Sequence, residues 1–309
     1  MQAQLDIILP VFIVIGFGYI VCWRGLFSEN AVDALVGFTQ NFAIPCLLFR
    51  AISEIEIGSA FSPDIIITYY LGAFASFFLG YFGARKFFNR SPIDAAAIAF
   101  CCFFSNTILL GLPITEQAYG ADALKGNFAI IAFHAPLCYF LGVSAMEIAR
   151  NRSSSFVEMS SRVSNAMFRN PFVIGIALGF FVNITGLPLP GPLSDGIDIL
   201  AQAALPAALF GLGGILFRYK PEGDTKTILM VCMISLIVHP TIVFATGTAL
   251  ALDQDSLRSA VVTASMAPGV NAYVFANMYG AARRVAASSV LIATAASIVS
   301  IWVWLNILP

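Results

Sequence analysis

Two apolar segments carry polar and helix-breaking residues in their middles, and this composition could form a binding site. The first reads SNTILLGLP over residues 105–113, and the second reads SMAPGVNAY over residues 265–273. Proline lacks a backbone N–H, glycine tolerates unusual dihedral angles, and asparagine can satisfy freed backbone groups or a ligand. We therefore predict that each segment breaks near its middle. The alternative is a kinked helix packed against its neighbours, since Gly and Pro are frequent in membrane helices.

Broken helices of this kind would favour an anionic ligand. Two half-helix N-termini that cross at mid-depth present partial positive charge without a basic side chain, which suits a carboxylate. No Lys or Arg lies centrally in any apolar run, and no Asp or Glu pair lies there to enclose a cation. We expect the substrate to be a small organic anion. The residues of these two segments that we expect to bind it are Asn106, Thr107, Pro268, Gly269 and Asn271, with Gly111, Pro113 and Pro268 as hinges.

The two histidines are the other candidates for chemistry, because ionisable groups at membrane depth are expensive and usually functional. His134 lies within an apolar run five residues before Tyr139, and both are predicted to line the site. A hydrogen-bonded packing role is the alternative for His134. His239 precedes Pro240 and could carry a proton, or its ring could repair the backbone that the proline disturbs.

Composition indicates a membrane protein. The 309 residues are 59% hydrophobic and 11% charged, with a mean hydropathy of +0.86, whereas soluble domains are about 25% charged. The net charge of -1 provides no basic field for nucleic acid. The six cysteines lack CxxC spacing, so we interpret them as packing residues and expect neither disulfides nor a bound metal or other cofactor. Residues 5–23 lack a basic n-region and a cleavage site, which favours a retained helix over a signal peptide.

Apolar runs of about 20 residues indicate spanning helices. Basic residues concentrate in alternate loops, as the positive-inside rule requires when both termini lie outside and residues 151–170 form a central cytoplasmic loop. The expected location is a bacterial inner membrane. We predict ten spans, near residues 5–23, 31–52, 63–84, 94–118, 123–149, 171–188, 193–217, 226–250, 256–279 and 284–307.

An internal repeat relates the two halves. At an offset of 161 residues, PxxIxIxxG at Pro10 matches the same pattern at Pro171, and PxxLF at Pro45 matches that at Pro206. With an offset of 160, Tyr119-Gly120 falls on Tyr279-Gly280. An odd number of helices in each copy turns the second copy upside down, as in many secondary transporters. The fold class is therefore predicted to be all-α and polytopic, with residues 1–150 and 171–309 as inverted five-helix repeats.

The sequence resembles the auxin efflux carrier family, which includes plant auxin exporters and bacterial malonate or malate permeases. The resemblance runs almost end to end, and three motifs carry it: NFAIPCLLF over 41–49, SNTILLGLPI over 105–114 and APGVNAYVFA over 267–276. By position, Asn106 resembles the family's crossover asparagine and Pro268 its crossover proline. His134 replaces a glutamine of the plant proteins. Asn41 is a further substrate-binding candidate in these motifs, and Pro45 and Pro206 are further hinge candidates.

The resemblance implies a fold like that of bile-acid transporters and sodium/proton antiporters, which moves by an elevator mechanism. Helices one, two, six and seven would form a scaffold, usually dimeric, and helices three to five and eight to ten the transport domain. Ser105 stands where plant exporters have proline, and the central loop of about 20 residues is far shorter than theirs. Plant-style phosphorylation control is therefore not expected, and the resemblance does not by itself imply auxin as the substrate; auxin-like monocarboxylates and dicarboxylates such as malonate or malate are both expected classes.

We predict a transporter of small organic anions, either monocarboxylates or dicarboxylates, in a lipid bilayer and as a homodimer. Coupling to protons, coupling to sodium and potential-driven uniport stay open at this stage. A channel would need a selectivity filter or a charged ring, and an intramembrane enzyme would need a nucleophile or metal cluster. The sequence shows neither. A membrane receptor would bind the substrate without flux.

Overall fold

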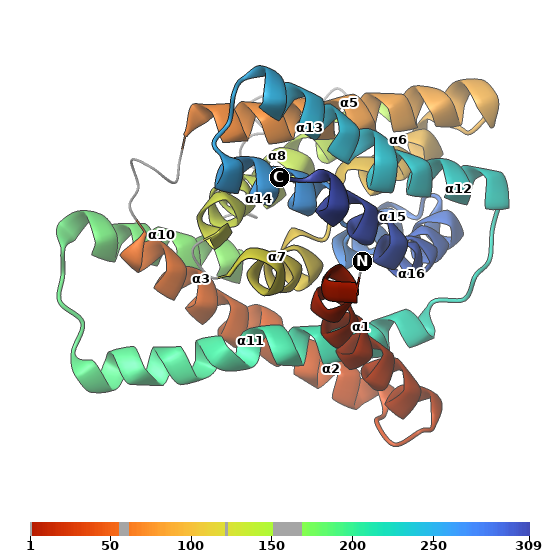
Figure 1. Cartoon of the computed structure of the whole chain (residues 1–309). Coiled ribbons are helices and arrows are strands. Elements are labelled where there is room, and N and C mark those ends of the chain that lie inside the picture. The colour runs from red at the N-terminus through yellow and green to blue at the C-terminus, as the bar shows by residue number, and fades with distance from the viewer. Residues whose placement is uncertain (1, 56–61, 121–122, 151–168) are drawn as a thin grey trace. The chain divides into compact units, whose positions relative to one another are not determined.

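The computed structural model describes residues 2–55, 62–120, 123–150 and 169–309. Throughout these ranges the chain forms helices, and the only β-type pairing is an isolated bridge between Ser105 and Pro268. Seven of the described helices are long and apolar enough to cross a membrane. Large apolar side chains such as Ile13, Phe82 and Ile184 are more than half exposed, as lipid-facing residues are. The protein is therefore a polytopic helical membrane protein (Figure 1).

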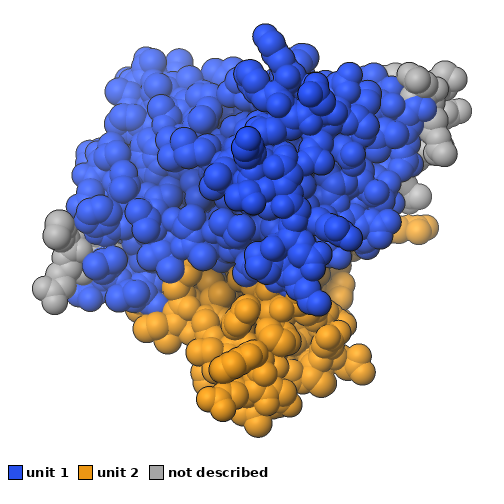
Figure 2. All heavy atoms as spheres, turned by 90° about the vertical axis from the view of Figure 1, so that its right-hand side faces the viewer, with its two compact units in different colours: residues 1–9, 61–161, 219–309 blue, residues 10–60, 162–218 orange. Residues whose placement is uncertain are grey.

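Backbone contacts divide the chain into two compact units, which Figure 2 distinguishes by colour. Unit 1 comprises Met1–Leu9, Phe61–Ser161 and Tyr219–Pro309, and unit 2 comprises Pro10–Ala60 and Arg162–Arg218. The predicted central loop, residues 151–170, lies almost wholly outside the described residues.

Unit 1 holds most of the helices and most of the large buried side chains of the described residues, including Tyr69, Phe100, Phe103 and Phe275. Helix α5 packs along α6 and α13, and α8 packs between α6 and α14. Its elements are α5 (Pro63–Phe87), α6 (Pro92–Phe103), η2 (Thr107–Gly111), α7 (Leu112–Tyr119), α8 (Leu124–Ala149), α12 (Thr225–Met233), η4 (Ile234–Val238), α13 (His239–Ala249), α14 (Gln254–Ala264), α15 (Val270–Tyr279) and α16 (Arg283–Ile307).

Unit 2 consists of close-packed helices in which glycines permit contact between backbones. A Cβ on Gly179 would lie 2.8 Å from the carbonyl oxygen of Phe49, and a Cβ on Gly18 would collide with that of Phe210. Small residues allow such approaches where lipid provides no hydrophobic driving force. The elements are α1 (Gln2–Trp23, in this unit from Pro10), α2 (Glu29–Phe38), η1 (Thr39–Ala43), α3 (Ile44–Glu54), α10 (Pro171–Thr185) and α11 (Gly191–Arg218).

Short π-helical turns precede three of the prolines. Turns η1, η2 and η4 end just before Pro45, Pro113 and Pro240, respectively. A proline cannot donate to the preceding turn and clashes with it, and a wider turn accommodates both effects. Helix α11, in contrast, passes through Pro206 without interruption. No break therefore marks the hinge predicted at Pro206, and its role stays a prediction.

Candidate functional site

Two extended strands of backbone cross inside unit 1, where the sequence predicts broken helices. Between α6 and η2 the chain leaves the helix at residues 104–106, and between α14 and α15 it does so at residues 265–269. The Asn106 N–H donates to the Ala267 carbonyl at 2.9 Å, and the Gly269 N–H donates to the Phe104 carbonyl at 2.8 Å. These two bonds form the antiparallel bridge at Ser105 and Pro268. We call residues 104–106 and 265–269 the crossing.

Polar side chains satisfy the helix ends that enter the crossing. The Ser235 hydroxyl lies 3.4 Å from the carbonyl of Cys101 and 3.5 Å from that of Cys102, in the last turn of α6. At the end of α14, the Ser265 hydroxyl donates to the Val262 carbonyl at 2.8 Å. Buried carbonyls without a donor would cost free energy. The helix ends are therefore stable without a ligand bound to them.

Two helix N-termini leave the crossing with little capping by side chains. The Asn106 Oδ1 atom accepts a bond from the Leu109 N–H at 3.3 Å at the start of η2. Gly269 precedes α15 and offers no side chain to its first N–H groups. Such N–H groups and the aligned peptide dipoles favour an anion. The crossing therefore has the polarity of an anion site.

Asn106 carries a hydrogen-bond donor that nothing in the described structure uses. The residue is 5% exposed, and its Nδ2 atom has no hydrogen-bond partner among the described residues. An unsatisfied buried amide costs about 1–3 kcal/mol, which indicates a position for a ligand or water. Asn271, in the first turn of α15, is half-buried. Thr107 is buried at the start of η2.

Both histidines contact residues 104–106, the first of the two chain segments that form the crossing. The His134 ring is 4.7 Å from the Phe104 ring, and His239 Nδ1 is 3.4 Å from the Ser105 hydroxyl. Tyr69 of α5 contacts both imidazoles, at ring distances of 5.8 Å to His134 and 5.3 Å to His239. A Cβ at Gly72 would meet the His239 ring at 3.1 Å, so this glycine admits the ring beside α5.

The contacts of the histidines bear on the roles considered for them, and these roles stay predictions. His239 reaches the crossing through Ser105, and the π-helical turn η4 precedes Pro240. His134 Nδ1 lies 3.7 Å from the Cys138 thiol, a weak contact within its own helix. The Nε2 atoms of both histidines are buried and lack a partner at ordinary hydrogen-bond geometry among the described residues. Backbone groups of Ser105 and Tyr69 nevertheless interact with His134 and His239, respectively.

An aromatic wall borders the crossing. Phe100 stacks on Phe275 at 4.0 Å and on Phe104 at 5.1 Å. Tyr139 contacts these rings at 5.4 Å to Phe100 and 5.8 Å to Phe104, and it remains half-buried. Gly142 admits the Phe100 ring, since a Cβ there would collide with it. The wall gives the crossing an apolar side beside its polar backbone.

The structure brings to the site two residues that the sequence analysis did not propose as site residues. It leaves three of the proposed residues, which belong to unit 2, outside the crossing. Tyr69 and Ser105 join the histidines, although an aromatic residue in an apolar run gives no signal of such a role. Gly111 and Pro113 follow the crossing in η2 and α7. The remaining candidates, Asn41, Pro45 and Pro206, belong to unit 2 and are not part of the crossing.

Unit 2 contains a cavity of its own. Its volume is about 230 Å³, and Cys22, Ser28, Glu29 and Arg218 are among its lining residues. The Arg218 guanidinium is already held by Asp33 at 2.7 Å and by the Glu29 carbonyl. Asp33 therefore compensates the charge of Arg218 at this cavity, although the buried Arg218 Nε atom has no hydrogen-bond partner among the described residues.

Comparisons with known proteins agree with a membrane carrier. A family model described as membrane transport protein matches residues 5–305. The transporter YfdV of Escherichia coli (strain K12), itself uncharacterized, is 23% identical over 97% of this chain and 96% of its own length. A protein of Rhizobium meliloti (strain 1021) whose name proposes malonate transport is 24% identical over 96% of this chain and 92% of its own length.

A plant protein is also among the relatives. Auxin efflux carrier component 5 of Arabidopsis thaliana is 22% identical over 88% of this chain and 86% of its own length. The resemblance found in the motifs at 41–49, 105–114 and 267–276 is thereby confirmed at the level of the family. The chain belongs to the membrane transport protein family, the family of the auxin efflux carriers, and is a membrane transporter.

Proposed function

We propose that this protein is a secondary transporter of small organic anions that binds their carboxylate at the crossing. The observation that carries the proposal is the unpaired, buried Asn106 amide nitrogen beside two sparsely capped helix N-termini. Helix N-termini and amide N–H groups together recognise anions without a full positive charge. Asn271 and Thr107 add polar groups, and Tyr139 belongs to the aromatic wall.

The substrate is a monocarboxylate or dicarboxylate with a modest apolar body. The backbone and amide donors suit the carboxylate, and the rings of Phe104 and Tyr139 suit the body. The names of two relatives agree with this class, since one names malonate and the other auxin, itself a carboxylate. We place the protein in a bacterial inner membrane with both termini outside, because of the distribution of its basic loops.

Ten spans in two inverted repeats would form the fold, and reciprocal contacts support the symmetry. Gly18 meets the Phe210 carbonyl, and Gly179 meets the Phe49 carbonyl. The offset of 161 residues relates Gly18 to Gly179 and Phe49 to Phe210, so each copy makes the same contact with the other. Two of the ten spans would be the broken pairs at the crossing, and α10 a third short one.

An elevator mechanism would move unit 1 as the transport domain along unit 2 as the scaffold. The division of the chain supports this, because unit 2 contains the predicted helices one, two, six and seven apart from the first residues of α1. Unit 1 contains the whole crossing. The scaffold would form a homodimer, as the family resemblance implies.

Uptake by proteoliposomes tests the proposal. Labelled malonate, malate and indole-3-acetate are offered to the wild type, to Asn106→Ala and to Asn277→Ala, an exposed asparagine of α15 as the control. We expect saturable uptake of at least one anion, a fall of roughly 10- to 100-fold in Asn106→Ala, and no change in the control. Undiminished uptake by Asn106→Ala would refute the site, and binding without flux would favour a receptor.

A further inference from the structure

The two buried imidazoles form a pair that the proposed anion site does not use. His134 is 3% exposed and His239 is fully buried. Tyr69 contacts both rings, and each ring touches the crossing, through Phe104 or Ser105. Each Nε2 atom lacks a hydrogen-bond partner among the described residues. We call His134 and His239 the histidine pair.

The described residues place no fixed negative charge beside the histidine pair. The titratable side chains that face it are Tyr69 and Tyr70 of α5 and Cys138 of α8. Neither imidazole has a carboxylate partner among the described residues. The charged residues of the helices packed against it lie toward helix ends, and they are Asp64, Arg85, Lys86, Asp94, Glu116, Lys125, Glu147, Asp255 and Arg258.

The nearest buried carboxylate along the chain is too far away to act as a counter-ion. Glu147 follows His134 by about 13 residues, or roughly 20 Å along α8. An imidazolium in this interior would therefore lack a partner while the crossing is empty, and such a charge is disfavoured. An anion at the crossing would supply the missing counter-charge.

We propose, on the basis of the proposed function, that the histidine pair is the coupling-ion site and binds one proton together with the organic anion. A proton from water binds to an imidazole nitrogen when the carboxylate occupies the crossing, and it leaves on the other side with the anion. Two imidazolium ions on either side of Tyr69 would repel each other, which limits the pair to one proton. Because linkage is reciprocal, each ligand strengthens the binding of the other.

Isothermal titration calorimetry of malonate binding measures how many protons the protein takes up per malonate bound. The full chain is purified in detergent and titrated with malonate at pH 7 in two buffers that differ in protonation enthalpy. We expect uptake of about one proton per malonate in the wild type, since imidazole titrates in this range. The double variant His134→Gln/His239→Gln should take up none and bind malonate about tenfold more weakly. The lipid-facing variants Phe133→Leu and Thr241→Val serve as controls on the same helices.

The outcomes separate this inference from the proposed function. Malonate binding by the wild type without proton uptake, or unchanged uptake in the double variant, would overturn the inference and leave the anion site intact. Failure to bind malonate, malate or indole-3-acetate at all would overturn both. Proton uptake that disappears only in the double variant, with both controls unchanged, would establish the pair.

Discussion

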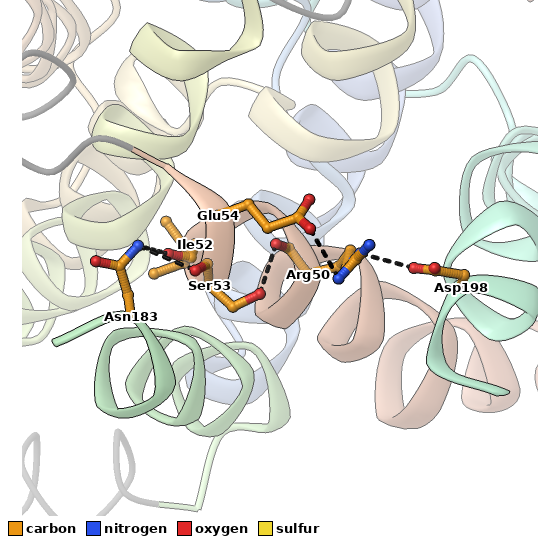
Figure 3. Close-up of polar contacts among 6 residues, drawn as sticks. All are labelled: Arg50, Ile52, Ser53, Glu54, Asn183 and Asp198. Atoms are coloured by element: carbon orange, nitrogen blue, oxygen red, sulfur yellow. Dashed lines mark hydrogen bonds and ion pairs between the residues drawn. The ribbon is translucent and has the colours of Figure 1, made fainter. Parts of the chain in front are cut away.

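Asn183 of unit 2 and Asn106 of unit 1 differ in how their amide nitrogens are bonded, although Arg218 of unit 2 also keeps a buried Nε atom without a partner among the described residues. In unit 2, Asn183 donates its Nδ2 hydrogens among the carbonyls of Ile52, Ser53 and Ile55 at the end of α3, at 2.8–3.1 Å. Figure 3 shows Asn183 with the first two of these partners. Arg50 lies between Glu54 at 2.9 Å and Asp198 at 2.8 Å in the same view. In unit 1, Asn106, His134 and His239 each keep a buried nitrogen without a partner in the described residues.

This difference distinguishes polar groups that stabilise the fold from polar groups that are available to bind a ligand. A satisfied asparagine at a helix end contributes stability and nothing more. An unsatisfied one in a close-packed interior costs free energy, which a ligand or water bound there for part of the time would offset. The unsatisfied groups of Asn106, His134 and His239 lie around one backbone crossing, which is why we propose that crossing as the transport site.

The substitution Asn106→Asp should have the largest effect, which we expect on anion uptake. Its Oδ1 atom can still cap η2, but a carboxylate replaces the spare amide donor and repels an anion. At about 4 Å and an effective dielectric constant near 20, that repulsion is worth about 4 kcal/mol. We expect uptake by the folded protein to fall by at least about 100-fold. The melting temperature in detergent should also fall, because the new carboxylate is buried. Undiminished uptake by the folded fraction would contradict the proposed role of Asn106.

The same substitution in unit 2 should lower stability and leave the KM for uptake unchanged. In Asn183→Asp a carboxylate oxygen would face the three carbonyls that the amide now bonds. We expect a loss of about 2–3 kcal/mol in stability and an unchanged KM for uptake by the folded fraction. A thiol-reactive dye can follow unfolding, since Cys22, Cys101 and Cys138 are buried. A changed KM with normal stability would contradict the assignment of Asn183 to the fold and of Asn106 to substrate binding.

Helix packing in unit 2 gives the next effect in size. In Gly179→Ala the new methyl group would press on the Phe49 carbonyl and on the Ile52 side chain, at 2.8 Å and 2.9 Å. Overpacking of this kind costs about 1–3 kcal/mol, and we expect a lower melting temperature with substrate affinity unchanged. Gly196→Ala on α11 is the matched control, because nothing lies within 4 Å of its Cβ position. Equal melting temperatures for the two variants would exclude close packing at Gly179.

The breaks at the crossing could be predicted from the sequence, and the cause of the second break is local. Pro268 and Gly269 stand at the break of the second segment, where α14 ends at Ala264. In the first segment α6 ends at Phe103, ahead of Gly111 and Pro113, and these two residues lie in the continuous η2 and α7. Proline alone is not sufficient, since α8 passes through Pro136 without interruption. The partners at the site were not predictable, because Tyr69 meets the histidines only through packing between distant segments of the chain.

If the transport role is confined to the interior of unit 1, the polar groups at its helix ends should affect transport as little as Asn183 of unit 2 does. Asp224 caps α12, and its pKa is held below the ordinary value of 3.8 by the hydrogen bond from the Thr227 hydroxyl, ahead of those from the Lys226 N–H and Arg90. Because folding lowers this pKa, the stabilisation is present above the ordinary value and is lost as the pH falls through the folded-state value.

Asp224→Asn should therefore lower stability by less than about 1 kcal/mol at pH 7, since the pair with Arg90 is partly exposed and screened. The difference from the wild type should vanish in acid, where the wild-type carboxyl is also neutral. Fluorescence of the three tryptophans, followed from pH 7 to about pH 3, measures both. Uptake should not change. If Asp224→Asn impaired uptake as Asn106→Asp does, the transport role would not be confined to the interior of unit 1. The partners of Asp224 at the helix ends of unit 1 would then have to be included in the transport site.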